Sequence, residues 1–300
     1  MIALTAAQIA EAVSGTLSAT LDPATVLVHV TPDSREVTAE GTLYVAKPGE
    51  RADGHDFIDA ALGAGAAAVL AERATHAPDG AAHPAIIVED AVLAMGALAR
   101  EVVRRVREHS PTTVIGITGS AGKTTTKDLL AALLATQGPT VAPVGSYNGE
   151  VGVPLTVFRA ELDTRFLVVE MGADHVGNIA YLCDIVRPDI GVVLMVGTAH
   201  AGSFGGVANI ARTKGELVEA LGPDGVAVLN LDDERVAGMA ARTAAPITWF
   251  TADERGVARA AELASHPGVA ALMWGAEDLV AMLRLAVGAG PTDERLPPIR

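Results

Sequence analysis

The segment ITGSAGKTTTKD, residues 117–128, carries the densest set of groups that could bind an anion. Two glycines can turn the backbone tightly and aim its N–H groups inward. A lysine and a hydroxyl follow directly, and at this spacing they suit the outer phosphates and the Mg²⁺ ion of a nucleoside triphosphate. A helix that begins at the lysine would add partial positive charge. The pattern predicts a phosphate-binding loop made of Gly119, Ser120, Ala121, Gly122, Lys123, Thr124 and Thr125.

The spacing departs from the strict phosphate-loop pattern, since position 117 is Ile and the nearest glycine is Gly116. A flexible strand-to-helix turn with an exposed lysine is therefore the alternative. The context favours the loop, because an apolar strand precedes it and a helical pattern follows.

Lysine is scarce in this chain, and that makes each one a candidate for a role that needs a compact ammonium group. Of the 22 basic residues, only four are lysines: Lys47, Lys123, Lys127 and Lys214. Chance retention stays open for any one of them.

Further candidates follow other apolar runs of the same region. Glu170 comes after FLVV and suits a magnesium carboxylate, or else a surface acid at a strand end. His200 comes after VLMVGTA and suits a metal ligand or a structural histidine. Lys214 lies in a helical pattern beside two glutamates, where a solvated surface lysine is the default. Asn230 precedes two aspartates, and either an Asx turn or nucleotide contacts explain this group.

The elements that must position these residues alternate clearly after residue 110. Apolar runs such as TTVIGIT, RFLVVEMG and DIGVVLMVG are separated by amphipathic helical patterns. That alternation predicts a doubly wound, mostly parallel α/β sheet over residues 111–250, with ligands at the carboxyl ends of its strands.

Residues 1–110 predict a smaller α/β domain. TAAQIAEAV reads as a helix with Thr5 as N-cap, and residues 41–47, 66–72 and 84–90 read as strands. From Val92 onward apolar residues recur at helical spacing and arginines lie opposite them. Residues 251–300 contain one helical pattern (277–287) and a polar, proline-containing tail.

Composition narrows the functional classes. The net charge of −14 argues against nucleic acid or an anionic membrane as partner. One cysteine, Cys183, excludes an internal disulfide framework and fits a reducing compartment. The first residues lack a basic signal-peptide region, and no uncharged run is long enough to span a membrane. We expect a cytoplasmic monomer.

Several segments, in order, resemble the Mur ligases of peptidoglycan synthesis: GITGSAGKTTTKDLL, YNGEVGVPLTV, VVEMGADHVGNIAYL, VGTAHAGSFG, ARTKGEL and VLNLDD. The pattern is most similar to the members that add D-alanyl-D-alanine to UDP-N-acetylmuramoyl-tripeptide. The resemblance implies an ATP-dependent amide ligation through an acyl phosphate, with Mg²⁺ as cofactor and those two small molecules as substrates.

The resemblance also implies roles for individual residues. Lys123 would bind the β- and γ-phosphates, and Thr124 and Glu170 a first magnesium ion. His200 corresponds to the family's metal histidine, and Lys214 to a lysine that becomes carbamylated and helps to hold a second magnesium ion. Lys127 would also lie near ATP. Nucleotide contacts are implied for Asn148 and Asn230.

The segment TPDSREVTAEGTLYVAKPGERADGHDFIDAA resembles the family's UDP-sugar-binding domain, so the UDP-sugar end would be contacted by Ser34, Arg35, Asp53, Gly54 and His55. The chain departs from the family at Gly149, where a second asparagine is usual. The pattern of the family's third domain is absent from residues 251–300, where we expect a short helical extension and tail.

Two other functions remain open on the sequence alone. One is a non-catalytic nucleotide- or nucleotide-sugar-binding protein derived from the ligase fold, which the missing third domain favours and the full set of ligand-type residues opposes. The other is a folylpolyglutamate- or cyanophycin-type ligase, which the D-S-R and D-G-H segments disfavour.

Overall fold

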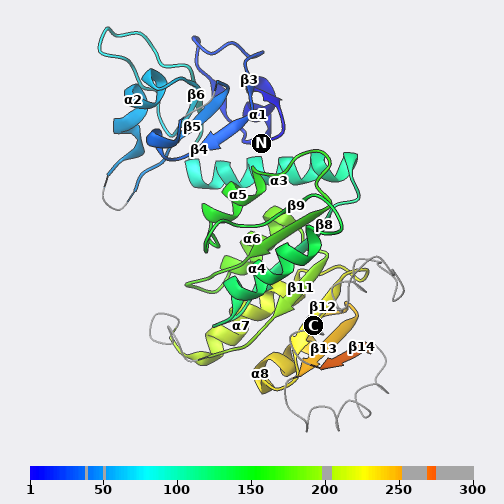
Figure 1. Ribbon diagram of the computed structural model, residues 1–300. Coiled ribbons are helices and arrows are strands. Elements are labelled where there is room, and N and C mark those ends of the chain that lie inside the picture. Colours follow the sequence, from blue (N-terminus) through cyan, green and yellow to red (C-terminus); the bar gives the residue numbers. More distant parts are fainter. Residues whose placement is uncertain (38–39, 50–51, 198–204, 252–268, 275–300) are drawn as a thin grey trace. The chain divides into compact units, whose positions relative to one another are not determined.

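A computed structural model describes residues 1–37, 40–49, 52–197, 205–251 and, as backbone alone, 269–274 (Figure 1). The chain divides into two compact units. The first comprises Met1–Pro111 and Glu150–Thr164, and the second Thr112–Gly149 and Arg165–Arg300. The sequence does not indicate that residues 150–164 group with the first unit.

The first unit is built on a five-stranded sheet with the order β2-β7-β6-β5-β4. Its strands pair in parallel except β2 with β7, which is antiparallel. The predicted strands over 41–47, 66–72 and 84–90 are confirmed as β5, β6 and β7. A separate antiparallel pair joins β1 to β3. The strands are β1 (Leu4–Thr5), β2 (Thr16–Leu17), β3 (Val26–Leu27), β4 (His29–Thr31), β5 (Thr42–Ala46), β6 (Ala66–Ala71) and β7 (Ala85–Ile87).

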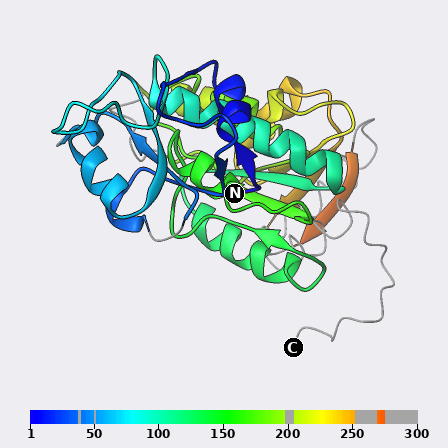
Figure 2. The same ribbon diagram turned by 90° about the horizontal axis from the view of Figure 1, so that it is seen from above.

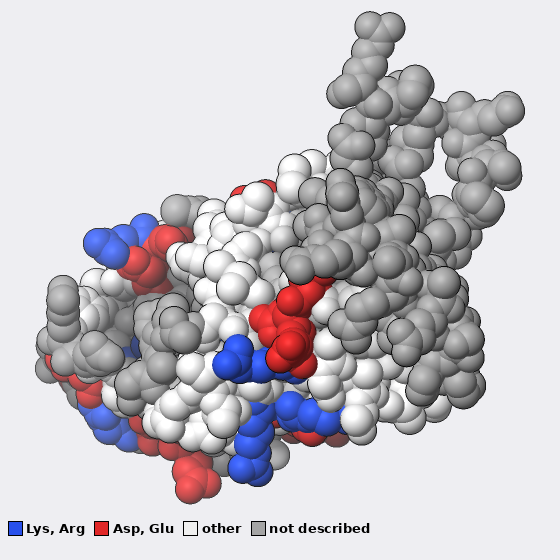
Figure 3. Space-filling view, turned by 90° about the horizontal axis from the view of Figure 1, so that it is seen from below, with Lys and Arg blue, Asp and Glu red and all other residues white. Residues whose placement is uncertain are grey.

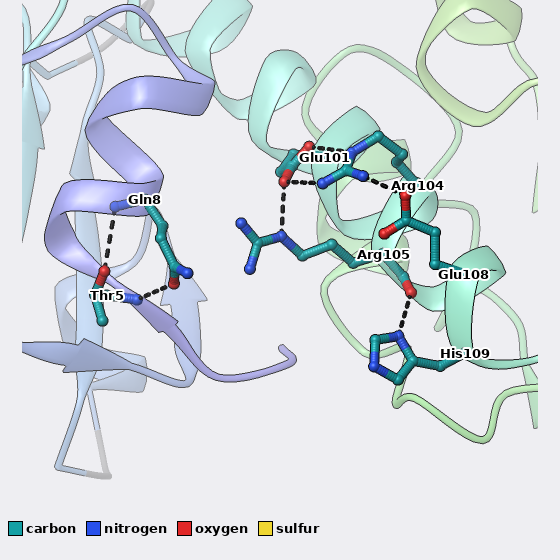
Figure 4. A network of polar contacts seen from close by, with 7 residues as sticks. All are labelled: Thr5, Gln8, Glu101, Arg104, Arg105, Glu108 and His109. Atoms are coloured by element: carbon teal, nitrogen blue, oxygen red, sulfur yellow. Dashed lines mark hydrogen bonds and ion pairs between the residues drawn. The ribbon is translucent and has the colours of Figure 1, made fainter.

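The first helix begins where its capping residues predict. Thr5 Oγ1 accepts the backbone N–H of Gln8 at 3.2 Å, and Gln8 Oε1 accepts that of Thr5 at 2.9 Å (Figure 4). Each side chain thus satisfies an N–H group that has no partner within the helix. Thr5 is confirmed as an N-cap. The helices of this unit are α1 (Ala6–Ala12), η1 (Ser34–Glu36), η2 (Gly54–Phe57), α2 (Ile58–Gly63), α3 (Ala91–His109) and α5 (Gly152–Val157).

The long helix α3 has the two faces predicted from its periodicity. Its apolar face is buried, while its exposed face pairs charges along one side (Figure 4). Glu101 accepts hydrogen bonds from Arg104 at 2.7 Å and from Arg105 at 2.6 Å. Side chains three and four residues apart meet on a helix, so these pairs support it locally. The buried face comprises Ala91, Ala94, Met95, Gly96, Leu98, Ala99, Val102, Val103 and Val106.

The second unit contains one parallel sheet of seven strands, in the order β14-β13-β12-β11-β8-β10-β9. The strands are β8 (Thr113–Thr118), β9 (Thr140–Val141), β10 (Phe166–Glu170), β11 (Ile190–Val193), β12 (Val226–Asn230), β13 (Ile247–Thr251) and β14 (Val269–Trp274). The helices are α4 (Lys123–Leu134), α6 (Asn178–Val186), α7 (Val207–Glu219), α8 (Glu234–Ala237) and η3 (Gly238–Arg242).

Helices cover both faces of this sheet, as in the predicted doubly wound fold. On one face, Leu130 and Leu134 of α4 pack in a cluster with Ile115 and Ile117 of β8. The alternate residues of β8 point to the opposite face, because side chains alternate along a strand. The expected α/β class is therefore confirmed.

On that opposite face, α7 is seated over two glycines that pair with each other. Gly116 of β8 lies beside Gly191 of β11 in the parallel register. A Cβ atom at Gly116 would lie 2.9 Å from Leu217 Cδ1, and one at Gly191 would lie 3.1 Å from Leu217 Cγ. The two glycines thus leave a flat area in which the fully buried Leu217 fits. This contact sets how closely α7 approaches the sheet.

The sequence does not predict β14. In the structure it extends the sheet beyond β13 by pairing in parallel with it (orange in Figure 1 and Figure 2). The helical pattern predicted over residues 277–287 lies outside the described residues.

Two surface features bear on partners. Among the described residues, no helix combines the length and apolarity needed to cross a bilayer. On the face drawn in Figure 3, the blue groups of Lys and Arg lie beside red groups of Asp and Glu.

The contact of Leu217 with Gly116 and Gly191 can be tested by changing the volume of these side chains. Leu217→Ala is expected to lower the free energy of unfolding by about 2–5 kcal/mol, because it leaves a cavity between α7 and the sheet. Gly116→Val fills the same space and is expected to cost about 1–3 kcal/mol through overpacking. Chemical denaturation measures both. Leu129→Ala, at a position 56% exposed, is the matched control and should change stability by about 0.5 kcal/mol or less. Equal losses of unfolding free energy in Leu217→Ala and Leu129→Ala would contradict this packing contact.

Candidate active site at the carboxyl edge of the parallel sheet

The predicted phosphate loop joins β8 to α4 and is shaped by its glycines. Gly122 has a φ of +83°, a conformation that side chains rarely adopt. A Cβ at Gly119 would lie 2.9 Å from Leu194 Cβ. Ser120 donates its backbone N–H to Met195 O at 2.9 Å, which ties the loop to the end of β11. The loop is thus held against the sheet by contacts that larger residues at 119 or 122 would disturb.

The loop leaves polar groups free to meet a ligand. Ser120 Oγ is buried and has no hydrogen-bond partner among the described residues. Within the same described part of the chain, no side chain caps the start of α4. Unpaired N–H groups at a helix start attract an anion. Lys123 Nζ donates to Gly119 O at 2.9 Å, so its ammonium lies over the loop.

A buried carboxylate stands beside this loop. Glu170 ends β10, which pairs with β8 so that Glu170 lies opposite Ile117. Its side chain is almost fully buried. Thr124 Oγ1 donates to Glu170 Oε2 at 2.9 Å, and Asn148 Nδ2 donates to Glu170 Oε1 at 2.8 Å. Three segments that are distant in sequence therefore meet at one carboxylate.

Lys214 is buried, in contrast to the solvated surface lysine that is the default expectation. Burial away from water, together with the positive charge of Lys123, lowers the pKa of Lys214 from 10.5 to about 8. Lys214 and Lys123 thus influence each other at the same edge of the sheet. The helix period of α7 cannot reveal this burial, because it depends on how α7 packs against α6 and the sheet.

Two charged side chains fix the helix that carries Lys214. Glu216, also buried, accepts the backbone N–H groups of Gly177 at 2.7 Å and Ala180 at 3.0 Å, which cap the start of α6. Arg242 donates to Arg212 O at 2.8 Å, and a Cβ at Gly215 would overlap its guanidinium. The sequence reading missed both contacts, since Glu216 looks like an ordinary surface acid there.

Asn230 supports the loop after β11. Its Nδ2 donates to Leu194 O at 2.8 Å, and its Oδ1 accepts the N–H of Asp232 at 2.9 Å. Asp233 Oδ2 accepts the N–H of Val196 at 2.7 Å. The Asx turn left open by the sequence is therefore present, and a nucleotide contact for Asn230 stays a prediction.

The other predicted ligands have three different outcomes. His200 lies outside the described residues. Lys127 is predicted near ATP, but its ammonium is buried and donates to Pro143 O and Gly145 O. It therefore contacts protein carbonyl groups. Ala121 is exposed in the loop, and Thr125 is exposed in the first turn of α4.

The oxygen atoms of Thr124 and Glu170 suit a magnesium ion, although the described residues do not form a complete ligand cluster. Among the described residues, no group of three or more His, Cys, Asp or Glu side chains is arranged to hold a metal. The Thr124 hydroxyl and the Glu170 carboxylate are adjacent, and hard oxygen donors of this kind suit Mg²⁺, which keeps several waters and phosphate oxygens as its other ligands.

In the first unit, Tyr44 links the two segments predicted at the UDP-sugar end. Its hydroxyl donates to Gly54 O at 2.9 Å. Burial, together with the charges of Asp33 and Asp53, raises the pKa of Tyr44 to about 12. The η1 turn with Ser34 and Arg35 and the η2 turn with Asp53 thus lie within electrostatic reach of one tyrosine.

Charge pairs order both turns. Asp33 pairs with the exposed Arg35 at 2.6 Å, and the hydrogen bonds from Arg35 lower the pKa of Asp33 to about 2. Asp53 accepts from Arg73 at 2.8 Å and from His55 Nδ1 at 2.6 Å.

His55 is buried, and its Nε2 accepts the N–H of Glu72 at 3.1 Å, which assigns the ring proton to Nδ1. Gly54 is tightly enclosed, because a Cβ there would lie 2.6 Å from Lys47 O. Sequence reasoning missed Tyr44 and Arg73, because both reach the D-G-H segment only through the fold.

The parallel sheet and its strand–loop–helix define an α/β protein of the phosphate-loop class, and comparison with known families identifies the family. The Mur ligase middle domain matches residues 117–280, and the Mur ligase family catalytic domain matches residues 27–103. The chain belongs to the Mur ligase family.

Two relatives from the branch that adds D-alanyl-D-alanine match most of this chain. The UDP-N-acetylmuramoyl-tripeptide–D-alanyl-D-alanine ligase of Mycobacterium tuberculosis is 46% identical and matches 85% of this chain and 54% of its own length. The corresponding Escherichia coli ligase is 38% identical over 78% of this chain and 49% of its own. The chain thus spans about half the length of the curated relatives it matches.

Solved structures of the same class of ligase also resemble this chain. A crystal structure of MurF from Acinetobacter baumannii superposes with a TM-score of 0.76 at 32% identity, over 84% of this chain and 55% of that one. MurF from Thermotoga maritima, solved in complex with ADP, gives a TM-score of 0.66 at 37% identity, over 75% of this chain and 50% of that one. The predicted likeness to the D-alanyl-D-alanine-adding members is confirmed.

The low pKa of Lys214 predicts a change of stability with pH. Between pH 8 and about 10.5 the folded state binds fewer protons than the unfolded state, so the free energy of unfolding rises with pH across this window. Below pH 8 the cost of burying the charge is fully present. Lys214→Met removes this cost and should stabilise the protein at pH 7 by on the order of 2–3 kcal/mol, since a tenfold change in an equilibrium is about 1.4 kcal/mol.

That advantage should shrink as the pH rises to 10. Chemical denaturation in CO₂-free buffer measures it, with Lys47→Met as the matched control. Parallel pH profiles for the wild type and Lys214→Met would contradict the low pKa.

Proposed function

We propose that this chain is an ATP-dependent carbon–nitrogen ligase that adds D-alanyl-D-alanine to UDP-N-acetylmuramoyl-tripeptide. The observation that carries the proposal is the buried Glu170 carboxylate, held by Thr124 and Asn148 directly beside the loop of Lys123. The names of the matched relatives support the same reaction.

The reaction would proceed in two steps. A carboxylate oxygen of the tripeptide attacks the γ-phosphorus of ATP and releases ADP, which gives an acyl phosphate. The amine of D-alanyl-D-alanine then attacks the acyl carbon, and the tetrahedral intermediate expels phosphate as the amide forms. Negative charge gathers on phosphate oxygens in both steps, so positioned cations and N–H groups would supply most of the catalysis.

The loop residues would bind the triphosphate. The N–H groups at the start of α4 and the freed Ser120 hydroxyl would meet phosphate oxygens. Lys123 would exchange its bond to Gly119 O for the β- and γ-phosphates. Thr124 and Glu170 would hold Mg²⁺, which when bound neutralises charge on those oxygens. Asn148 would orient Glu170, and Asn230 would contact the nucleotide.

Lys214 would act as a carbamate. A neutral amine can attack CO₂, and the low pKa of Lys214 makes the neutral form abundant near pH 8. The resulting carboxylate-like group would reduce the repulsion from Lys123 and help to hold a second magnesium ion. A metal role for His200 also belongs to this proposal.

The first unit would bind the UDP-sugar end of the substrate through Ser34, Arg35, Asp53, Gly54 and His55. The convergence of their two turns on Tyr44 supports this assignment. We also propose that the protein works as a monomer in the cytoplasm without a nucleic-acid partner, in keeping with its net charge of −14.

The direct test supplies the purified chain with ATP, Mg²⁺, UDP-N-acetylmuramoyl-tripeptide and D-alanyl-D-alanine. We expect phosphate release that depends on the amine, and a product whose mass equals the two substrates joined with loss of water. Lys123→Ala should bind ATP at least about 100-fold more weakly, since a buried charge contact is worth several kcal/mol. Lys47→Ala, in the first unit, is the matched control for ATP binding.

ATP binding without any amine-dependent phosphate release would favour a nucleotide-binding protein over a ligase. Unchanged ATP affinity in Lys123→Ala would contradict the loop assignment.

A further inference from the structure

Lys127 is a buried cation that the proposed reaction does not use. Its side chain is 2% exposed, and its Nζ donates to Pro143 O at 3.0 Å and to Gly145 O at 2.9 Å. Its acidic neighbour is Asp128, at 2.7 Å, whose side chain is 66% exposed. Burying an ammonium is costly unless its hydrogen bonds are satisfied. The two carbonyl groups are therefore its principal partners inside the protein.

Those carbonyl groups belong to the loop that follows β9, here called the 142–149 loop. Its large side chains do little to anchor it, because Val144 is 63% exposed and Tyr147 is 51% exposed. Ala142 and Pro143 pack inward, but residues 144–147 are exposed, so this part of the loop depends on polar contacts for its conformation. The ammonium of Lys127 is the contact that reaches two of its carbonyls at once.

The far end of the 142–149 loop contacts the candidate magnesium carboxylate. Asn148 donates from Nδ2 to Glu170 Oε1 at 2.8 Å, and its carbonyl accepts the N–H of Gly172 at 2.8 Å. A Cβ at Gly172 would lie 2.6 Å from Asn148 Oδ1. Asn148 is thus fitted against the end of β10 by both its backbone and its side chain.

Helix α4 is therefore linked to Glu170 both directly and through the 142–149 loop. Thr124 donates directly to Glu170 Oε2 at 2.9 Å. Lys127 lies three residues later, on the same side of the helix, and fixes the loop that brings Asn148 to Oε1. Each carboxylate oxygen of Glu170 thus accepts one hydrogen bond. One donor, Thr124, lies on α4, and the other, Asn148, lies in the loop that Lys127 of α4 contacts.

We propose that Lys127 is a positioning residue: by clamping the carbonyls of Pro143 and Gly145 it orders the 142–149 loop, and through Asn148 it orients Glu170 toward the metal. The part that concerns the metal rests on the proposed function. The part that concerns the loop does not, because it follows from the hydrogen bonds alone.

The test measures the loop and the metal separately in Lys127→Met, which keeps most of the apolar side chain and removes its donors. Hydrogen exchange at the Gly172 amide should accelerate at least about tenfold as Asn148 is released. Mn²⁺ affinity of the ATP complex, followed by electron paramagnetic resonance, should fall about tenfold, as is typical when a group behind a metal ligand is lost. ATP affinity without metal should change less than about twofold, because the ammonium of Lys127 donates to Pro143 O and Gly145 O, which lie outside the phosphate loop.

Asp128→Asn is the matched control. It removes the exposed ion-pair partner but leaves both carbonyl contacts, so Gly172 exchange and Mn²⁺ affinity should match the wild type. Changes in Asp128→Asn as large as those in Lys127→Met would overturn the proposal, because the ion pair would then account for the effect.

Circular dichroism establishes that each variant is folded. Should Lys127→Met not fold, Lys127→Gln replaces it. Its uncharged side chain is one atom shorter than that of lysine and should not reach both carbonyls, so Gly172 exchange should again accelerate. Wild-type exchange at Gly172 in the folded variant overturns the proposal. A wild-type protein that binds neither ATP nor Mn²⁺ would contradict the proposed function, while Gly172 exchange would still decide the role of Lys127.

Discussion

A carboxylate buried at the edge of a sheet must be held by donors on both oxygens, and Glu170 meets this constraint through Thr124 and Asn148. The constraint ties together α4, the end of β10 and the loop after β9. Because Thr124 follows Lys123 directly, holding the carboxylate also places it beside the phosphate loop. The hydrogen bonds that the buried Glu170 carboxylate requires thus also bring the parts of the site together.

The opposite side of the site depends on helix packing. Gly116 and Gly191 let α7 approach the sheet closely, and Glu216 joins α7 to the start of α6. This packing buries Lys214, and the positive charge of Lys123 acts on its ammonium. A cation buried beside another cation favours its own neutral form, which is the chemistry that carbamylation requires.

The sequence predicts the parts of this structure that depend on local pattern. The strand–loop–helix at residues 113–134, the N-cap at Thr5 and the two faces of α3 all follow from neighbouring residues. What it misses depends on packing between distant segments. Lys127 reads as another cation of the phosphate loop, yet its ammonium is buried against carbonyls sixteen and eighteen residues away. Tyr44 joins two turns that the sequence shows separately.

The central claim is that Glu170 and Thr124 stand where the metal of a bound nucleotide belongs. A crystal structure of the chain with Mn²⁺ and a non-hydrolysable ATP analogue tests it most directly, because the anomalous signal locates the metal independently of the protein atoms. We expect the triphosphate in the loop of Lys123 and the Mn²⁺ signal beside Thr124 Oγ1, on the side of Glu170. A metal signal on the phosphates but remote from both side chains, or a nucleotide bound away from the loop, would contradict the claim.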